Sequence, residues 1–354
     1  MTRWIMATAA AVVLAACGAA DDQPASVSEE DQGPVVTTVD AGYGSIELHG
    51  DHDLFPDGAQ ITDLGGDFGW SEGPVWIRDG GYLLFTDVPG NAIHKYDPAT
   101  GALSEWMNPS GPSDVTDAMR SPGANGLLNY GEGRILVPVH GERALFAMDL
   151  ATQTKTPLAT AYKGKRLNSP NDVVVHDSGA IFFTDPPYGL AGQDDSDAKE
   201  LDFNGVFKLA ADGTLTVVDQ TLSRPNGIAV SPDGLYLYAT EALPEKAAFL
   251  RYPIAADGTV GKPDRVLDVS QPRADAGFGN PDGMVVATDG TIFATGPGGL
   301  WVMDGNLRTL AKLVMPKPCA NATFGGADGS TLYMTCYDRL VSVKTNRTGL
   351  EFAP

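Results

Sequence analysis

The amino-acid sequence predicts an all-β fold, a six-bladed β-propeller, because one segment with an invariant spacing recurs six times along the chain. Each copy starts at an acidic residue or Asn, here called the anchor, and reaches a glycine eight residues later. The anchors are Glu72, Asn125, Asn171, Asn226, Asp282 and Asn321, and the glycines are Gly80, Gly133, Gly179, Gly234, Gly290 and Gly329. Successive anchors stand 53, 46, 55, 56 and 39 residues apart, which is typical of propeller blades.

The segments around each of these glycines have the composition of antiparallel strands. An Asp, Glu or Ser precedes every one of the glycines, as in a tight hairpin turn. The runs that follow, such as Tyr82 to Phe85 and Leu235 to Tyr238, are short and rich in residues that favour strands. Because the last anchor leaves room for about three strands, we expect residues 61–66 to pair into the final blade and close the ring.

The predicted propeller domain spans residues 45–354, and the residues before it are predicted to form a signal peptide and a flexible tether. Residues 1–16 have the short apolar run of a signal peptide. Leu14-Ala15-Ala16-Cys17 is similar to a bacterial lipobox, which would make Cys17 the lipid-modified first residue; an ordinary signal peptide is the alternative. Residues 17–44 would form a flexible tether. We expect the propeller in the periplasm of a bacterial cell envelope, and Gly18 favours an outer-membrane anchor.

The charge balance limits the possible partners. The chain has 24 Lys and Arg against 45 Asp and Glu, a formal net charge of -21. Such a surface repels phosphate backbones and anionic lipids, so we expect no nucleic acid and no membrane contact beyond the lipid anchor. A small neutral or cationic molecule is the expected partner, and the sequence leaves the oligomeric state open.

Two cysteines follow the signal region, Cys319 and Cys336, and they flank a strand-turn-strand pattern. An antiparallel hairpin would bring its two ends together, and an oxidising periplasm would allow a disulfide. Two unpaired buried thiols are the alternative, because the register of the hairpin cannot be read from the sequence.

The anchors predict a central metal site. Repeat symmetry places equivalent residues of all blades around one axis, and all six anchors carry side-chain oxygens. Two carboxylates among amide oxygens suit one divalent cation, with Ca²⁺ favoured and Zn²⁺, Mg²⁺ or Mn²⁺ also able to enter. Capping of backbone groups by Asn and Asp is the alternative, and it explains Glu72 poorly.

Several motifs resemble one known family. SEGPVW, GANGLL, LNSPNDVVV, FTDPPYGL, RPNGIAVSPDG, NPDGM and TGPGGLWV, between Gly69 and Val343, resemble the gluconolactonase branch of the senescence marker protein, gluconolactonase and luciferin-regenerating enzyme superfamily. The resemblance implies a six-bladed propeller that holds one divalent metal and hydrolyses lactones or related esters. It implies that the metal ligands are Glu72, Asn171, Asn226 and Asp282.

Further roles are predicted around these ligands. The resemblance implies that Asp282 doubles as general base for a metal-activated water, and that Asn125 and Asn321 bind substrate or water. His140 is a candidate proton shuttle, with a structural role as the alternative. Arg143 is a candidate substrate ligand, or else forms an ion pair. Asp185 and Tyr188 could line the pocket mouth, or belong to a structural loop.

The favoured function is hydrolysis of a small neutral sugar lactone such as glucono-1,5-lactone. A phosphotriesterase-like hydrolase on the same metal site and a non-catalytic propeller lipoprotein that binds a protein or cell-wall partner are the alternatives. The G-x-S-x-G match at residues 69–73 does not indicate a serine hydrolase, because a strand follows it where a nucleophile elbow needs a helix. The glycines at 296–299 lack the context of a dinucleotide site.

Overall fold

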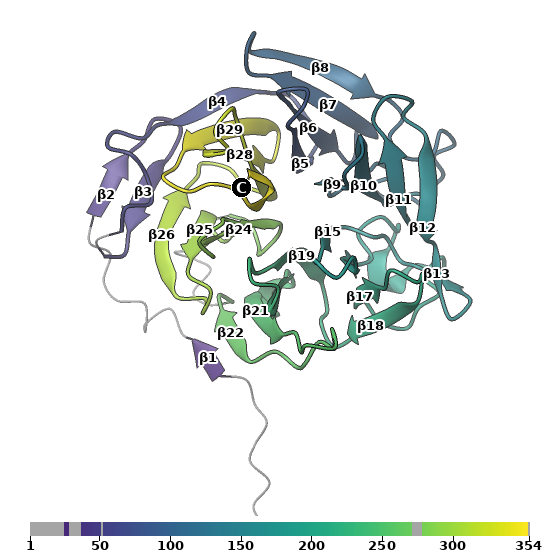
Figure 1. Ribbon diagram of the computed structural model, residues 1–354. Coiled ribbons are helices and arrows are strands. Elements are labelled where there is room, and N and C mark those ends of the chain that lie inside the picture. The colour runs from purple at the N-terminus through teal and green to yellow at the C-terminus, as the bar shows by residue number, and fades with distance from the viewer. Residues whose placement is uncertain (1–24, 28–36, 51, 271–277, 353–354) are drawn as a thin grey trace, which may run out of the picture.

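The computed structural model describes residues 25–27, 37–50, 52–270 and 278–352. Six larger antiparallel sheets surround a central axis, and Figure 1 shows them arranged as a ring. The six-bladed propeller predicted from the repeat is therefore confirmed. The predicted signal peptide and Cys17 lie outside the described residues. Within the described ranges, no helix has the length and apolarity needed to cross a bilayer.

The first three blades follow the chain in order, each with its innermost strand first. The first blade contains β5 (Ser71–Ile77), β6 (Tyr82–Asp87), β7 (Ala92–Asp97) and β8 (Ala102–Met107). The second contains β9 (Leu128–Asn129), β10 (Arg134–Val139), β11 (Ala144–Asp149) and β12 (Lys155–Ala159). After a small hairpin of β13 (Ala161–Tyr162) and β14 (Lys165–Arg166), the third contains β15 (Val173–Val175), β16 (Ile181–Asp185), β17 (Gly205–Leu209) and β18 (Leu215–Asp219), with the 3₁₀ helix η2 (Gln193–Asp195) between β16 and β17.

The fourth and fifth blades are extended at their outer edges by N-terminal segments. The fourth contains β19 (Pro225–Val230), β20 (Tyr236–Glu241), β21 (Ala248–Pro253) and β22 (Arg265–Asp268), with η3 (Pro244–Lys246) before β21. The fifth contains β23 (Met284–Val286), β24 (Ile292–Gly296), β25 (Gly299–Met303) and β26 (Thr309–Val314). The added strands are β1 (Ala25–Val27), parallel to β22, and β2 (Thr37–Asp40) with β3 (Ser45–Leu48) beside β26.

The N-terminal hairpin pairs with the outer edge of the fifth blade. β2 pairs with β3 in register, with Thr37 opposite Leu48, and β3 pairs with β26. Sheet structure therefore begins inside the segment 17–44 that was expected to be a tether. The reason is that the outermost strand of the fifth blade offers an open edge, and an N-terminal hairpin covers it.

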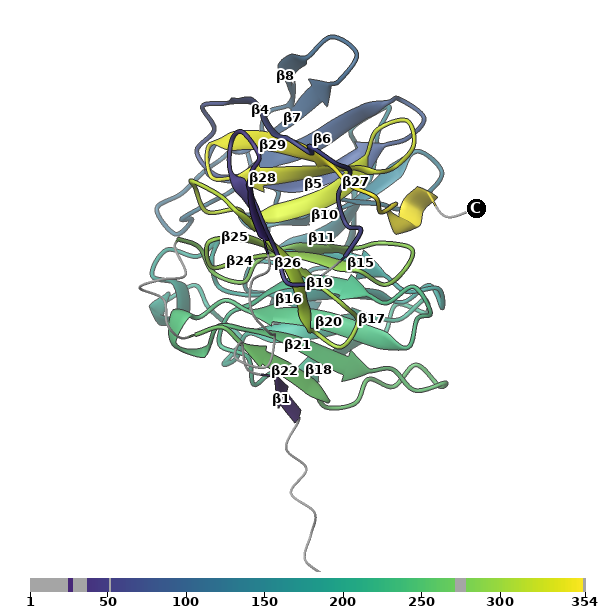
Figure 2. The ribbon, with the colours of Figure 1, turned by 90° about the vertical axis from the view of Figure 1, so that its left-hand side faces the viewer.

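The sixth blade closes the ring with strands from both ends of the chain. It contains β27 (Asn321–Gly325), β28 (Thr331–Cys336) and β29 (Arg339–Lys344), and its fourth strand is β4 (Ile61–Gly66). β4 pairs antiparallel with β29, with Ile61 opposite Val343, so the predicted closure is confirmed. The last described element is η4 (Leu350–Phe352), which Figure 2 shows on one face of the ring.

Apolar side chains fill the spaces between blades and hold the ring together. Phe183 stacks on Phe207 at 5.3 Å within a cluster that also contains Leu136 and Leu145 of the preceding blade. Trp76 of the first blade stacks on Tyr333 of the last, at 5.8 Å and 8°. Burial of aromatic area across the closing seam stabilises the ring without a continuous sheet.

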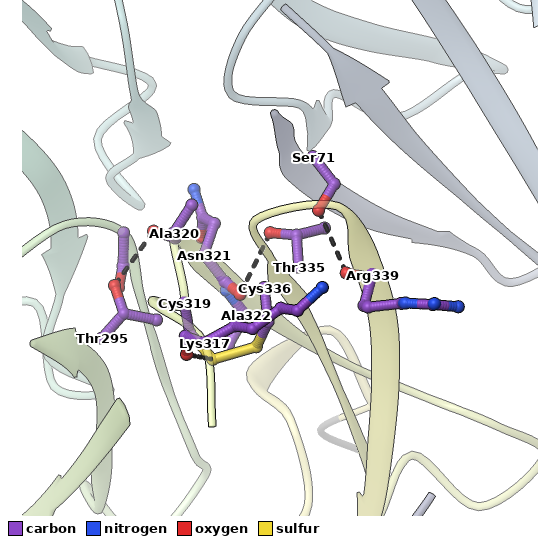
Figure 3. Close-up of a disulfide and its surroundings, with 11 residues drawn as sticks. Ser71, Thr295, Lys317, Cys319, Ala320, Asn321, Ala322, Thr335, Cys336 and Arg339 are labelled. Carbon is purple, nitrogen blue, oxygen red and sulfur yellow. Dashed lines mark hydrogen bonds between the residues drawn. A yellow bond between two sulfur atoms is a disulfide. The ribbon is translucent and has the colours of Figure 1, made fainter. Parts of the chain in front are cut away.

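Cys319 and Cys336 form a disulfide, so the open alternative of two free thiols is settled. The bond joins the residue two before β27 to the last residue of β28 (Figure 3). The two cysteines lie close together because β27 and β28 pair antiparallel, with Asn321 opposite Thr335. The disulfide therefore ties the loop that enters the sixth anchor to the next strand.

We expect replacement of both cysteines with Ser to lower the free energy of unfolding by about 3 kcal/mol, because a cross-link of this loop length restricts the unfolded chain. Denaturant unfolding of the wild type and the double variant would measure the loss. A reducing agent should produce the same loss in the wild type and none in the variant. Equal unfolding midpoints for the wild type and the double variant, each with and without the reducing agent, would contradict the expectation.

Candidate functional site

The anchors lie at or just before the start of the innermost strands, and neighbouring anchors pack backbone against backbone. A Cβ on Gly73 would lie 2.0 Å from the carbonyl oxygen of Asn125. A Cβ on Gly227 would likewise lie 2.0 Å from the carbonyl oxygen of Asp282. Glycine is needed after these anchors because any larger residue would collide with the next blade. This close approach gathers the anchor side chains at one end of the axis.

A threonine-acid pair recurs on the second strand of three blades and fixes the loops that carry the anchors. The acids are Asp87, Asp185 and Glu241, and each accepts hydrogen bonds from the two backbone N–H groups that lie two and three residues before an anchor. The threonines are Thr86, Thr184 and Thr240, and their hydroxyls bond to the carbonyl oxygens of Asn125, Asn226 and Asp282 at 3.1, 2.6 and 3.2 Å. Each blade thus positions its own anchor and that of its neighbour.

Above the anchors lies a cavity of about 400 Å³, within the usual range for small-molecule sites. Its lining includes five of the six anchors, all except Asn321. Asn321 lies beside the floor, where its amide Nδ2 lies 3.3 Å from Oε2 of Glu72. Trp70, Val88 and Pro89 form part of an apolar wall, and Tyr188 also lines the cavity.

Two carboxylates face each other at the floor. The side chains of Glu72 and Asp282 lie within hydrogen-bonding reach of each other. Burial raises the pKa of Glu72 to about 7. Burial and the charge of Glu72 also raise the pKa of Asp282. In the described part of the chain, no Lys or Arg forms an ion pair with either carboxylate. A bound cation would relieve both the burial cost and the mutual repulsion.

Three anchor oxygens at this floor are buried and accept no hydrogen bond. They are Oδ1 of Asn125, Oδ1 of Asn226 and Oδ1 of Asp282. Buried acceptors are nearly always paired, so three partnerless oxygens in one place fit a hard cation that they would coordinate. Among the described residues, no group of three or more His, Cys, Asp or Glu side chains forms a metal cluster.

His140 is buried against two anchors and has a fixed tautomer. Its Nε2 lies 3.1 Å from Nδ2 of Asn125 and 3.4 Å from Nδ2 of Asn171, and amide nitrogens only donate. The ring proton must therefore be on Nδ1, which donates to Oγ of Ser121 at 3.0 Å. Ser121 in turn donates to the carbonyl of Tyr188 at 3.3 Å.

This network supports the structural alternative for His140 over the proton shuttle. Burial, with a smaller contribution from Arg120, lowers the pKa of His140 to about 3, so the ring stays neutral near pH 7. Both ring nitrogens are occupied. By accepting from the amide nitrogens of Asn125 and Asn171, His140 orients those side chains so that their oxygens face away from it.

Two other expected substrate ligands lie outside the cavity. Arg143 donates from Nε to the carbonyl of Leu167 at 2.6 Å and from Nη1 to the carbonyl of Ala198 at 2.7 Å. It thus ties together surrounding loops, and its substrate role is corrected to a structural one. Asp185 is also corrected, because it is fully buried and holds the loop before Asn171. Burial raises the pKa of Asp185 to about 7.

One buried carboxylate beside the anchors is not among the residues predicted from the sequence. Asp172 accepts hydrogen bonds from the N–H groups of Val173 and Ile228, and burial raises its pKa to about 7. Its charge also acts on Glu72 and Asp282. Aligning the repeats would have found it, since Asp172 stands where four other blades have the glycine after the anchor.

The fold and the site together define a class: a β-propeller with a ring of oxygen donors on its axis, beneath a pocket for a small molecule. Comparison with known proteins agrees with this class. Residues 70–338 match the family described as SMP-30/Gluconolactonase/LRE-like region, and the chain belongs to this family. The resemblance inferred from the motifs is confirmed.

Several of the similar proteins are named as lactonases. The chain is 38% identical over 294 residues to the gluconolactonase of Zymomonas mobilis subsp. mobilis, covering 82% of each chain. It is 30% identical over 269 residues to pentonolactonase XacC of Haloferax volcanii, covering 75% of this chain and 80% of that one. A solved gluconolactonase structure from Xanthomonas campestris superposes with a TM-score of 0.70 at 26% identity, covering 88% and 98% of the two chains. Lactonase-like hydrolysis is the activity that these relatives support.

Proposed function

We propose that this protein is a divalent-metal-dependent hydrolase of a sugar lactone. The observation that carries the proposal is the pocket floor, where two facing carboxylates and partnerless amide oxygens meet. Glu72, Asn171, Asn226 and Asp282 would hold the ion, and their all-oxygen donor set favours Ca²⁺. A bound divalent cation polarises a carbonyl oxygen and makes a nearby water more acidic.

Asp282 is the proposed general base. Asp282 lines the cavity, and one of its carboxylate oxygens would accept the proton while the other holds the ion. The carboxylate would take a proton from the attacking water as the water oxygen bonds to the lactone carbonyl carbon. The ring C–O bond then breaks, and the departing ring oxygen receives that proton and becomes a hydroxyl group. The products are the open-chain hydroxy acid and the regenerated carboxylate.

The substrate class is supported by the cavity and by the relatives. A cavity of about 400 Å³ holds a molecule the size of a monosaccharide. The relatives named gluconolactonase and pentonolactonase support a lactone of a five- or six-carbon sugar acid. Trp70 at the wall offers an apolar face against which a sugar ring can pack.

The test is acid release from glucono-1,5-lactone above the spontaneous rate, with protein treated with chelator and then reloaded. We expect chelation to abolish hydrolysis and Ca²⁺, or another divalent ion, to restore it. Hydrolysis that persists unchanged in chelator would overturn the metal dependence. No hydrolysis of any aldonolactone by the metal-loaded protein would overturn the function.

The role of His140 gives a separate prediction. Replacing His140 with Ala should weaken divalent-cation binding by about 10–100-fold, because two anchor amides lose the acceptor that orients them. Calorimetric titration of the metal measures this directly. Gln at this position can still accept one amide hydrogen bond, and we expect it to retain more affinity than Ala. Equal affinities for wild type and both variants would contradict the orienting role.

The proposed location is the periplasmic side of the cell envelope, with a lipid anchor on Cys17. The support is the sequence Leu14-Ala15-Ala16-Cys17 and the Cys319–Cys336 disulfide, which is typical of oxidising compartments. We expect a Cys17→Ser variant to move from the membrane fraction to the soluble fraction. An unchanged distribution would argue against lipidation.

A further inference from the structure

One side chain in the pocket has a charge opposite to that of the floor. Arg120 is the only Lys or Arg among the described residues that line the cavity. It lies on the long connection between β8 and β9, outside any strand. None of the sequence motifs or site roles described above includes it.

The backbone of Arg120 is fixed to the loop that follows Tyr188. Its N–H donates to the carbonyl of Gly189 at 2.9 Å, and Met119 forms a bridge with Leu190. On its other side, Ser121 bonds to His140 and to the carbonyl of Tyr188. The side chain therefore extends from a rigid rim, and a short chain of hydrogen bonds connects that rim to the anchors at the floor.

The guanidinium of Arg120 makes no ion pair or hydrogen bond within the described ranges, although acids outnumber bases by 45 to 24 in the chain. Seven of the other described arginines do pair with carboxylates: Arg134, Arg143, Arg224, Arg251, Arg308, Arg339 and Arg347. Arg120 is exposed, so it has kept a full set of donors available to a ligand in the cavity.

The charges of the cavity have a simple sum once the proposed metal is bound. Glu72 and Asp282 contribute two negative charges, a divalent cation cancels them, and Arg120 leaves the lining with one positive charge. The net charge of the lining side chains and the ion is then positive, while the buried carboxylate of Asp172, outside the lining, is held by two backbone N–H donors. A guanidinium matches the geometry of carboxylate, sulfonate and phosphate groups with two parallel hydrogen bonds.

We propose that Arg120 forms an anion subsite, and that the preferred substrate is a sugar lactone with a negatively charged group at the end of the molecule remote from the lactone carbonyl. This inference rests on the proposed function. With the carbonyl at the anchor floor, the far end of a monosaccharide lies toward the rim. The net charge of the chain predicts a neutral substrate. The subsite changes this expectation to an anionic substrate, because a positive charge inside the pocket attracts an anion there.

Matched substrate pairs test the subsite. Galactono-1,4-lactone and galactaro-1,4-lactone differ only by a carboxylate at C6, and glucono-1,5-lactone and its 6-phosphate differ only by the phosphate. We expect kcat/KM of the metal-loaded wild type to be at least about tenfold higher for the charged member of one pair, mostly through KM. The pair that shows the preference identifies the anionic group. Higher ionic strength should reduce the preference.

Substitutions assign the preference to Arg120. Arg120→Gln should reduce the charged-to-neutral ratio of kcat/KM by about tenfold, and Arg120→Lys should keep part of it. Arg134→Gln, a change at the first residue of β10 and outside the cavity lining, should leave the ratio unchanged. A ratio near one in the wild type, or a ratio that Arg120→Gln does not alter, would overturn the subsite while lactone hydrolysis persists. Failure to hydrolyse either member of both pairs would instead overturn the proposed function.

Discussion

Replacing Asp282 with Asn is expected to lower kcat/KM for lactone hydrolysis by about 10³-fold. The change removes one of two floor carboxylates, the proposed base, and half of the negative charge that would hold the cation. A loss of ~4 kcal/mol of transition-state stabilisation corresponds to this factor. Steady-state rates above the spontaneous hydrolysis of the lactone would measure it.

The same substitution should not destabilise the metal-free fold. Asp282 lies against Glu72, and burial and repulsion raise the pKa of both groups. Removing one of the two carboxylates therefore removes their repulsion and lowers the free-energy cost of burying charge. We expect the Tm of metal-free Asp282→Asn to equal or exceed that of the metal-free wild type. Asp212→Asn, in an exposed turn, is the control for loss of a surface carboxylate. An Asp282→Asn protein with wild-type activity would refute the assigned role.

The ring architecture could be predicted from the sequence because each blade repeats the same local chemistry. The turn after each anchor needs a glycine: Gly234, for example, has a φ of 70°. In the first blade the neighbouring Gly81, at 64°, takes the positive φ in place of Gly80. The start of the folded part could not be placed, since β2 and β3 pair with a sheet whose open edge is a property of the assembled ring.

The floor of the site could be predicted, and its surroundings could not. Equivalent anchors must meet on the axis, so symmetry alone brings Glu72 and Asp282 together. His140 and Arg143 both follow the second anchor and both are buried, but what they contact depends on the course of the loops. Arg120 could not be predicted for the same reason, because it lines the pocket from a long connection without a repeat.

Metal removal should destabilise the protein far more at pH 8 than at pH 5. Burial raises the pKa of Glu72 from 4.5 to about 7 in the metal-free fold. An acid whose pKa is higher in the folded than in the unfolded chain does not affect the stability of the fold below its unfolded pKa, because it is protonated in both states. Such an acid lowers the free energy of unfolding progressively as pH rises from 4.5 to about 7. The cost for Glu72 is then on the order of 3 kcal/mol above pH 7. Asp282 adds to it in the same direction.

A bound cation would cancel this cost where the carboxylates are ionised, so the Tm difference between metal and chelator should increase by at least about 5 °C from pH 5 to pH 8. His140 acts in the opposite direction: its folded pKa is about 3 against 6.5 in the unfolded chain, so its contribution is lost as pH falls below 6.5. The contribution of His140 cancels when the Tm with metal and the Tm with chelator are compared at the same pH, because the His140 ring is neutral in both folded forms. Replacing Glu72 with Gln and Asp282 with Asn together should abolish the difference at both pH values. A Tm difference that is the same at pH 5 and pH 8 in the wild type would mean that the floor carboxylates do not hold the ion.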